Sequence, residues 1–220
     1  MPKLIVAAMP IDDDWRKLDP RLVEAVKSCD LLIAEESKTA LRLLAVVGER
    51  EKPITLINEH STDADRDETL QKILSAEISV LISDAGTPCI ADPDYRLVNL
   101  CIDKGVELLS VSGASSIITA LSVSGFCAKQ FIFLGFPPRE ERERKKFFRE
   151  LKETKITAVF LERPYALKQT LSDMSDFKQM VSISVALGTE GEMNVRGIPH
   201  KIADRLDGIK AAFAVVVNKL

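Results

Sequence analysis

Small and polar residues gather in residues 83–88, directly after a short apolar run. Asp84 and Thr87 offer polar groups, whereas Ala85 and Gly86 allow a ligand to approach the backbone closely. Ligands of open α/β sheets bind at the carboxyl ends of the strands, where this segment would lie. The segment therefore predicts a ligand-binding loop, although the spacing fits an ordinary strand-to-helix turn equally well.

Residues 111–116 repeat this arrangement, with small side chains between an apolar run and an expected helix. The first backbone amides of a helix have no partner within the helix, so the turn at Ser115 and Ser116 suits a carboxylate or hydroxyl ligand. A simple capping turn is the alternative. Two such loops in succession favour a shared binding site over two unrelated turns.

Several common catalytic patterns are missing from the sequence. It has no GxGxxG after the first apolar run, no Walker loop, no GxSxG and no HExxH. Its four cysteines form no CxxC pair and it has only two histidines, which argues against a metal site of the zinc type. We expect buried or half-buried free thiols in a reducing compartment.

The sequence contains no run of ~18 apolar residues, the length of a membrane span, and its apolar start suits a first strand better than a signal peptide. We therefore expect a cytoplasmic protein without a membrane partner. The net charge is only −3, so no strong overall field attracts nucleic acid. Residues 139–153 interleave seven Lys and Arg with glutamates, and Arg142, Arg144, Lys145, Lys146 and Arg149 are the candidates for a basic stripe. A salt-bridged surface helix is the favoured interpretation of this segment, and a basic stripe for phosphates is the other.

Short apolar runs alternate with amphipathic segments through the first half of the chain. The expected strands are residues 4–8, 31–34, 54–57, 79–82 and 106–111, and the expected helices are residues 20–28, 37–47, 62–76 and 93–104. This rhythm predicts an α/β fold with a mainly parallel sheet and helices on both faces.

The second half has a different pattern, with one pair of runs that suits a hairpin. The expected strands are residues 131–134, 157–161, 181–187, 193–198 and 211–217, and the expected helices are residues 115–124, 139–153, 164–172 and 199–206. These elements predict a mixed sheet. We place the domain boundary near Ser112, which gives N-terminal and C-terminal α/β domains of residues 1–112 and 113–220.

Together, these segments resemble the tetrapyrrole methylase superfamily. The resemblance rests on SDAGTPCIADPDYRLV, the SGASS turn, AEESK, FLGFPP and FLER, which follow one another in the order typical of that superfamily. The most similar branch methylates the ribose 2′-oxygen of a cytidine in small-subunit ribosomal RNA. The resemblance implies a homodimer of two-domain chains, with S-adenosylmethionine in the cleft between the domains. It also implies a set of cofactor-binding residues, namely Pro10, Asp84, Ala85, Gly86, Thr87, Ser115, Ser116, Leu161 and Leu187.

The sequence departs from this branch where substrate would bind. The first loop reads Pro-Ile-Asp-Asp-Asp over residues 10–14 instead of Pro-Ile-Gly-Asn, and Lys38 stands where the branch has arginine. Tyr165 and Ala211–Ala212 interrupt two later motifs. The resemblance therefore supports cofactor binding more strongly than a ribosomal substrate.

A methyl transfer to a ribose hydroxyl needs an aligned acceptor and a group to accept its proton. The candidates are Glu35, Glu36, Asp84, His60 and Lys38, of which we select Glu36 and Lys38 as catalytic residues. We expect a methyltransferase acting on ribosomal RNA. A methyltransferase for a small molecule such as a tetrapyrrole, or a non-catalytic cofactor-binding dimer, is the alternative.

Overall fold

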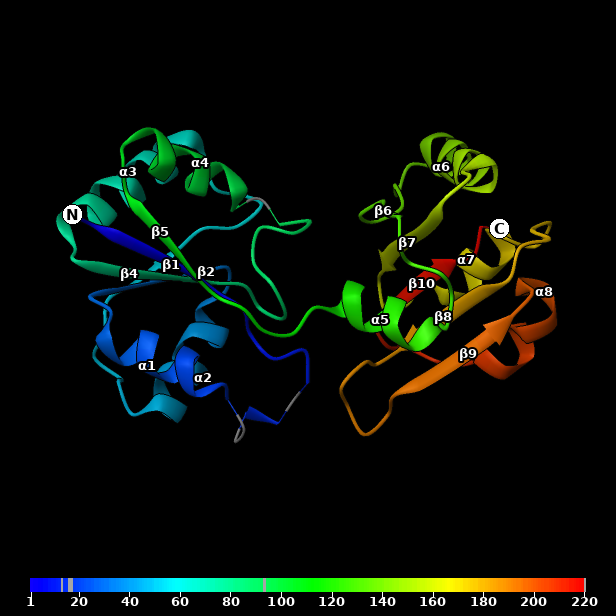
Figure 1. Cartoon of the computed structure of the whole chain (residues 1–220), viewed down its shortest axis with the longest axis horizontal. Helices are drawn as coiled ribbons and strands as arrows, with labels where there is room; N and C mark the ends of the chain where they lie inside the picture. The colour runs from blue at the N-terminus through cyan, green and yellow to red at the C-terminus, as the bar shows by residue number, and fades with distance from the viewer. Residues whose placement is uncertain (13, 16–17, 93, 220) are drawn as a thin grey trace. The chain divides into compact units, whose positions relative to one another are not determined.

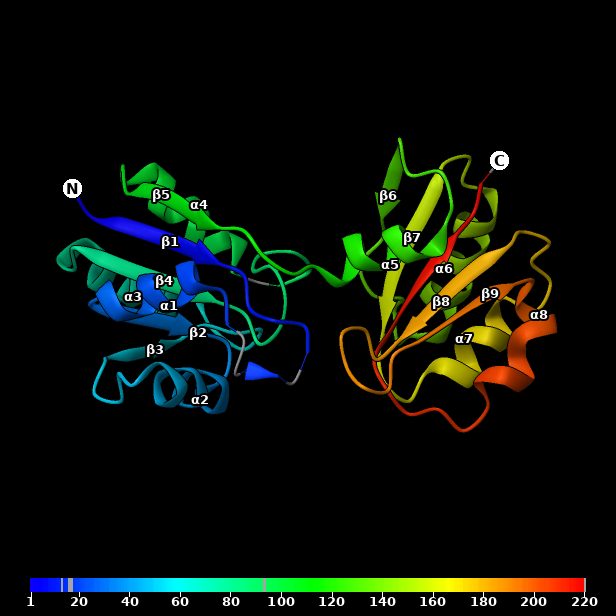
Figure 2. The ribbon, with the colours of Figure 1, turned by 60° about the horizontal axis from the view of Figure 1, so that its bottom comes forward.

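The computed structural model describes residues 1–12, 14–15, 18–92 and 94–219. The chain forms two compact units, which we call unit 1 (Met1–Ser115) and unit 2 (from Ser116 onward). Each unit contains its own five-stranded sheet, as Figures 1 and 2 show.

The sheet of unit 1 is wholly parallel. Its strands are β1 (Lys3–Ala7), β2 (Leu31–Ala34), β3 (Ile54–Leu56), β4 (Ile78–Ile82) and β5 (Glu107–Val111). They lie in the order β3-β2-β4-β1-β5. Every neighbouring pair is parallel, so the carboxyl ends of all five strands meet at one edge of the sheet.

Helices cover both faces of this sheet. They are α1 (Pro20–Ser28), α2 (Ser37–Val47), α3 (Asp63–Ser75) and α4 (Tyr95–Asp103). Successive residues of β2 point to opposite faces, so Leu32 packs in the cluster with α1 and α2, whereas Ile33 packs in the cluster with α3 and α4. Figure 1 shows the two helix pairs on either side of the strands. The expected parallel α/β arrangement is confirmed.

Local capping residues explain where these helices begin and end. Asp19 accepts a hydrogen bond from the Arg21 backbone amide at 2.8 Å, and Pro20 follows it as the first helical residue. Thr62 and Asp65 form a reciprocal capping box at the start of α3. Gly48 ends α2 in the left-handed conformation, with φ of +86°.

The sheet of unit 2 is mixed. Its strands are β6 (Phe131–Phe133), β7 (Thr157–Glu162), β8 (Val181–Val185), β9 (Met193–Gly197) and β10 (Phe213–Val217), in the order β6-β7-β10-β8-β9. β6 and β7 are parallel, whereas β10 is antiparallel to both of its neighbours. β8 and β9 form the expected antiparallel hairpin. The carboxyl ends of β7 and β8 therefore share an edge with the start of β10.

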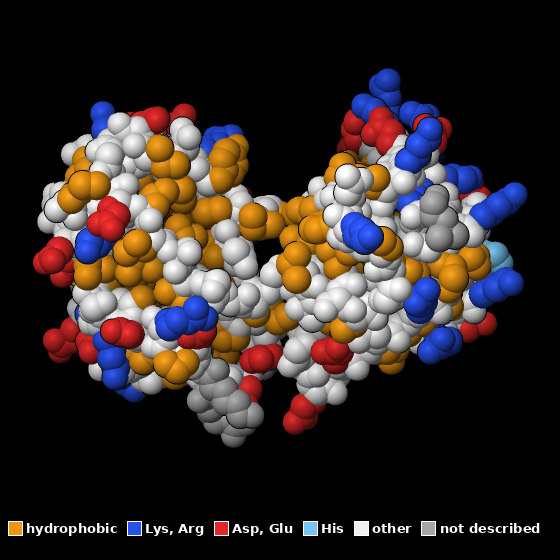
Figure 3. All heavy atoms as spheres, viewed as in Figure 1, with side chains coloured by type: hydrophobic (Ala, Val, Ile, Leu, Met, Phe, Trp, Pro, Cys, Tyr) orange, Lys and Arg blue, Asp and Glu red, His pale blue; other side chains and the backbone are white. Residues whose placement is uncertain are grey.

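Helices also flank this second sheet. They are α5 (Ser116–Ser124), α6 (Glu141–Glu153), α7 (Leu167–Asp173), α8 (Pro199–Ile202) and the 3-10 helix η2 (Ala203–Leu206). The outer surface of α6 is crowded with charged side chains of both signs (Figure 3). Its inner face contributes Phe148 and Leu151 to the core and also carries the buried Arg144.

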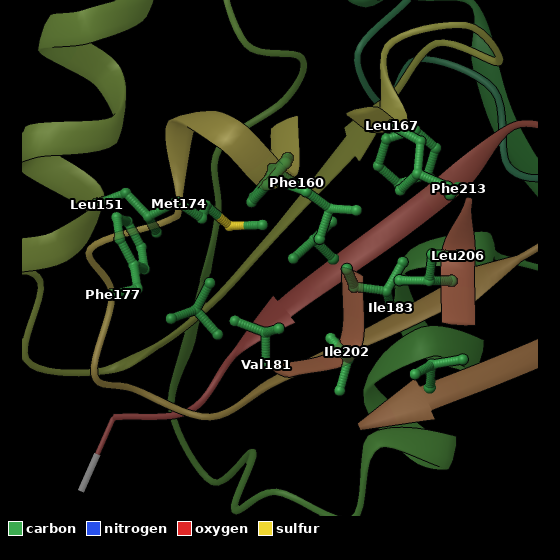
Figure 4. Close-up of a cluster of buried hydrophobic side chains, with 14 of the residues drawn as sticks. Leu151, Phe160, Leu167, Met174, Phe177, Val181, Ile183, Ile202, Leu206 and Phe213 are labelled. Atoms are coloured by element: carbon green, nitrogen blue, oxygen red, sulfur yellow. The ribbon is translucent and has the colours of Figure 1, made fainter. Parts of the chain in front are cut away.

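The main core of unit 2 lies between the sheet and α6, α7 and α8 (Figure 4). Phe160 of β7 is fully buried there, and it contacts Phe148 edge to face with ring centroids 5.9 Å apart. β10 sends Phe213 and Val215 into this core, whereas Val216 points to the opposite face. That face is covered by α5.

Several details differ from the sequence-based expectation. β8 ends at Val185 and not at residue 187, and β10 begins at Phe213 and not at residue 211. α6 begins at Glu141 because the Glu140 carboxylate caps it, accepting from two backbone amides. α7 begins only at Leu167. Cys127 is exposed, although all four cysteines are free as expected. Among the described residues, no helix combines the length and the apolar character needed to cross a membrane.

Candidate functional site

Three loops leave the carboxyl edge of the unit 1 sheet and are bonded to one another. They are residues 8–12 after β1, residues 83–92 after β4 and residues 112–115 after β5. Met9 and Gly86 exchange backbone hydrogen bonds, with N–O distances of 2.8 and 3.1 Å. The Ala8 amide donates to the Val111 carbonyl at 2.9 Å. The loop after β1 is thus bonded to the loop after β4 and to the last residue of β5, because β1 lies between β4 and β5 in the sheet.

Gly86 and Thr87 join the loop after β4 to the loop after β5. The Thr87 hydroxyl donates to the Ala114 carbonyl at 3.0 Å. Gly86 has a φ of +76°, and a Cβ atom there would lie 3.3 Å from Ile11 Cγ2 and 3.6 Å from the Ala114 oxygen. Gly86 is therefore required by backbone conformation and by packing. This adds a structural reason to the expected one, close approach of a ligand.

Unusual backbone conformations mark the same edge. Cys89 and Ala91, in the loop after β4, both have φ of 67°. A residue other than glycine in this region costs on the order of 1–3 kcal/mol, and such residues cluster at functional sites. The third case is Ala186, with φ of 50°, which directly follows β8 in unit 2. All three lie beyond the carboxyl end of a strand.

A group of acids lies in and beside the loop after β4. Burial, reinforced by the negative charges of Asp92, Asp94 and Asp84, raises the pKa of Glu35 to about 8. Burial and then the Asp92 charge raise the pKa of Asp94 to about 7. The pKa of Asp92 rises to about 6, from burial and the charge of Asp84. These carboxyl groups therefore exchange protons near neutral pH, well above their ordinary range.

Several oxygens in this acid cluster, which comprises Glu35, Asp84, Asp92 and Asp94, are buried without a partner. Within the described part of the chain, no hydrogen bond reaches Glu35 Oε1, Asp84 Oδ1 or either carboxylate oxygen of Asp94. Asp94 itself is fully buried. No group of three or more His, Cys, Asp or Glu side chains in the described residues is arranged to hold a metal ion. The cluster can hold protons or face a positively charged group.

Comparison with known sequences places this chain in a known family. The sequence pattern of the family described as Tetrapyrrole (Corrin/Porphyrin) Methylases matches residues 3–198. The chain belongs to this family. Its fold also matches a crystal structure of diphthine synthase with a TM-score of 0.74 and 13% sequence identity, over 98% of this chain and 89% of that one.

Two curated relatives carry the name ribosomal RNA small subunit methyltransferase I. The relative from Halalkalibacterium halodurans is 34% identical over 154 residues, which cover 70% of this chain and 53% of the relative. The relative from Bacillus subtilis is 31% identical over 202 residues, which cover 90% of this chain and 69% of the relative. This family member therefore spans between about half and about two thirds of the length of these relatives.

In this tetrapyrrole methylase family member, the six cofactor-site residues expected in unit 1 lie on the three bonded loops. They are Pro10, Asp84, Ala85, Gly86, Thr87 and Ser115. Ala85 is exposed, whereas Pro10 and Asp84 are half-buried. The loops thus bring together residues that lie more than a hundred positions apart in the sequence, because the parallel sheet collects its strand ends at one edge.

The other three expected cofactor residues belong to unit 2. Leu161 lies near the carboxyl end of β7, and its amide donates to the Gly135 carbonyl at 2.9 Å. Leu187 lies just beyond β8 and is buried. Ser116 is the first residue of α5, which packs against β8 and β10. Leu161 and Leu187 therefore share one edge of the unit 2 sheet.

The two residues selected as catalytic do not lie in the acid cluster. Glu36 and Lys38 are exposed at the start of α2, where Glu36 occupies the N-cap position without a side-chain capping bond. Glu35, one residue earlier, is the acid that turns inward. His60 is an exposed loop residue, with Nε2 3.6 Å from Glu59 Oε1. The structure thus places Glu35 and Asp84 in the acid cluster and leaves Glu36, Lys38 and His60 outside it.

Sequence reasoning did not single out Asp92 and Asp94. Their position in the sequence could have indicated them, since both follow the candidate loop of residues 83–88 and flank a proline. In the acidic first loop, Asp12 is half-buried and its Oδ1 accepts from the Asp14 amide at 2.9 Å. Asp13 lies outside the described residues. Tyr165, a further departure from the expected motifs, is 81% exposed.

Proposed function

We propose that this protein transfers the methyl group of S-adenosylmethionine to RNA of the small ribosomal subunit, at a ribose 2′-oxygen. The proposal rests mainly on the three bonded loops of unit 1, which carry most of the expected cofactor residues. Family membership and the names of the two curated relatives support the type of reaction and the RNA acceptor.

The residues at the loop edge fit this cofactor. S-adenosylmethionine carries a sulfonium and an ammonium group, and it supplies an electrophilic methyl group when bound. Glu35 Oε1 and Asp84 Oδ1 are buried carboxylate oxygens without a partner among the described residues. A cationic ligand would satisfy such atoms. The backbone of residues 84–87 would form the wall of the pocket, with Thr87 keeping the loop after β5 in place.

Glu35 is the proton acceptor in this proposal. With a pKa of about 8, Glu35 is mostly protonated at neutral pH, so its ionised fraction, which is a stronger base than an ordinary glutamate, is the form that accepts the proton. The exposed Lys38 would bind a phosphate of the RNA near the acceptor, and the neighbouring Glu36 would orient the acceptor ribose. Glu36 and Lys38 thus keep a role at the exposed start of α2.

Transfer of tritium from labelled S-adenosylmethionine tests this function. The acceptor should be small ribosomal subunits from cells that lack the corresponding methylation. We expect label in the RNA at a ribose that becomes resistant to alkaline cleavage. Folded protein that binds the cofactor but leaves these subunits unlabelled would contradict the RNA acceptor.

A small-molecule acceptor is the second candidate. The specific observation in its favour is the acidic character of the loop edge, where the half-buried Asp12 and Asp84 would repel phosphates. This candidate predicts that label from the cofactor enters a metabolite fraction and not RNA. Label in neither fraction would leave cofactor binding without catalysis, the non-catalytic alternative.

A further inference from the structure

The two units carry net charges of opposite sign, which nearly cancel in the net charge of the whole chain. From Ser116 onward the sequence has 17 Lys and Arg against 12 Asp and Glu, a net charge of +5. Residues 1–115 have 13 Lys and Arg against 21 Asp and Glu, a net charge of −8. An anionic partner is therefore attracted to unit 2 and repelled by unit 1.

Ion pairs within unit 2 account for some of the cations of α6. Arg144 is buried and binds Glu162 at 2.8 Å and Asp173 at 2.6 Å. Lys145 pairs with Glu141 on the same helix at 2.5 Å, and Lys152 pairs with an aspartate after α7. These three cations are neutralised by the protein itself.

Arg142, Lys146 and Arg149 remain, and we call them the α6 stripe. All three are exposed, and none forms an ion pair with a described residue. Their spacing of four and then three residues places them on one side of the helix, over a rise of about 10 Å. The buried residues of α6 lie on the opposite side, so the α6 stripe faces outward.

Acidic side chains limit what this surface can bind. Glu143 and Glu150 are exposed and form a neighbouring row on α6, and the exposed Glu153 continues the line of the stripe at the end of the helix. The carboxylate of Glu140 is occupied by the cap of the helix. A row of three cations beside a row of two acids suits an extended, linear anion better than a broad anionic surface. Guanidinium groups also bind phosphate oxygens through two parallel hydrogen bonds.

We propose that the α6 stripe binds the phosphate backbone of the RNA substrate. This inference rests on the proposed function, because it requires an RNA acceptor. The stripe is an interaction surface of unit 2, separate from the loop edge of unit 1 that carries the proposed chemistry. Contacts to phosphates position the RNA without reading its sequence.

The test replaces all three cations, as Arg142→Gln, Lys146→Gln and Arg149→Gln in one full-length variant. The matched control carries Lys104→Gln, Lys178→Gln and Arg205→Gln, which are also exposed and without an ion pair to a described residue, so both variants lose the same charge. Binding of unmethylated small-subunit ribosomal RNA is measured over a series of salt concentrations, together with affinity for S-adenosylhomocysteine.

We expect the stripe variant to bind RNA on the order of tenfold to a hundredfold more weakly at low salt, with the salt-dependence slope reduced by about 2 for three lost contacts. The KM for small ribosomal subunits should rise, and affinity for S-adenosylhomocysteine should not change. Equal losses in both variants would indicate a general charge effect and overturn the proposal. Unchanged RNA binding in the stripe variant would also overturn it and favour a protein partner for this surface. If the wild type does not methylate RNA, that result contradicts the proposed function and is distinct from a failure of the stripe proposal.

Discussion

Gly86 shows how one residue can serve the backbone and the site together. Its positive φ and its contact with Ile11 hold the loop after β4 in its bonded conformation. Gly48, at the end of α2, has a similar φ of +86° but nothing within 4 Å of the position a Cβ would take. Comparing substitutions at the two glycines therefore distinguishes the cost of a positive φ from the cost of a steric contact.

We predict that Gly86→Ala lowers the melting temperature more than Gly48→Ala does. Left-handed backbone costs both variants about 1–2 kcal/mol, or several degrees for a chain of this size. Only Gly86→Ala must also displace Ile11 or the Ala114 carbonyl. Thermal unfolding measured by circular dichroism checks the order, and equal shifts would show that the loop accommodates a Cβ freely.

The acid cluster makes stability depend on pH near neutrality. Glu35, Asp94 and Asp92 have folded-state pKa values raised to about 8, 7 and 6. The folded state therefore holds more protons than the unfolded state over this range, and the free energy of unfolding should fall as pH rises from about 5 to about 8. Carboxylates with lowered pKa values, such as Asp19, act in the opposite direction only at more acidic pH.

We predict that Asp94→Asn is more stable than the wild type at pH 8 and similar to it at pH 5. Asparagine resembles the protonated carboxyl group and relieves the repulsion on Asp92 and Glu35. Urea unfolding at four pH values between 5 and 8.5 measures this. Asp103→Asn, at the exposed end of α4, is the control and should leave the wild-type slope unchanged. An Asp94→Asn curve parallel to the wild type would refute the electrostatic interpretation.

The choice between Glu35 and Glu36 could not be made from the sequence. All four residues of β2 are buried, so the strand has no alternation from which the direction of the next side chain can be extrapolated. Which of the two side chains turns inward depends on the turn into α2 and on the loop after β4, which is distant in sequence. The small residues of that loop, in contrast, were visible directly, because their types alone suggested close backbone packing.

At the scale of elements, one buried ion network fixes α6 to its neighbours. Arg144 of α6 donates to Glu162 at the end of β7, to Asp173 at the end of α7 and to Thr170. The Glu162 carboxylate also accepts from the Arg163 amide at 2.9 Å. The same network therefore orients α6 and the segment that follows β7.

We predict that Arg144→Met lowers the free energy of unfolding by about 3–5 kcal/mol, because Asp173 loses its cation and the buried Glu162 keeps only its 3.3 Å pair with Arg163. Lys145→Met, one position further, removes only an exposed pair with Glu141 and should have a far smaller effect. Urea unfolding of the two variants provides the comparison. Losses of similar size would mean that the buried network contributes little.

This network also explains why the start of α7 was predicted wrongly. Pro164 is a good first residue for a helix, and the sequence alone places the start there. In the structure the Arg163 side chain donates hydrogen bonds to the Pro137 carbonyl and to the Glu162 carboxylate. α7 begins at Leu167, three residues after Pro164. The starts of α1 and α3 were predictable because their caps lie next to them in the sequence.

At the scale of the whole molecule, the alternation of strands and helices was sufficient to predict both sheets. The parallel sheet followed from the β-α rhythm of the first half, and the mixed sheet followed from the hairpin of β8 and β9. The separation of charge between the units was missed because a net charge of −3 averages over the chain. It becomes visible only when the two units are counted apart.

Calorimetric titration with S-adenosylhomocysteine tests most directly whether the bonded loops of unit 1 hold the cofactor. The wild type should bind one molecule per chain. Thr87→Val, which removes the hydrogen bond to the Ala114 carbonyl, should weaken binding about tenfold, equivalent to ~1.4 kcal/mol. Thr154→Val, which removes a similar bond to the Glu150 carbonyl at the end of α6, should leave the affinity unchanged. A folded wild type that releases no heat of binding, or a Thr87→Val variant with wild-type affinity, would contradict the assignment.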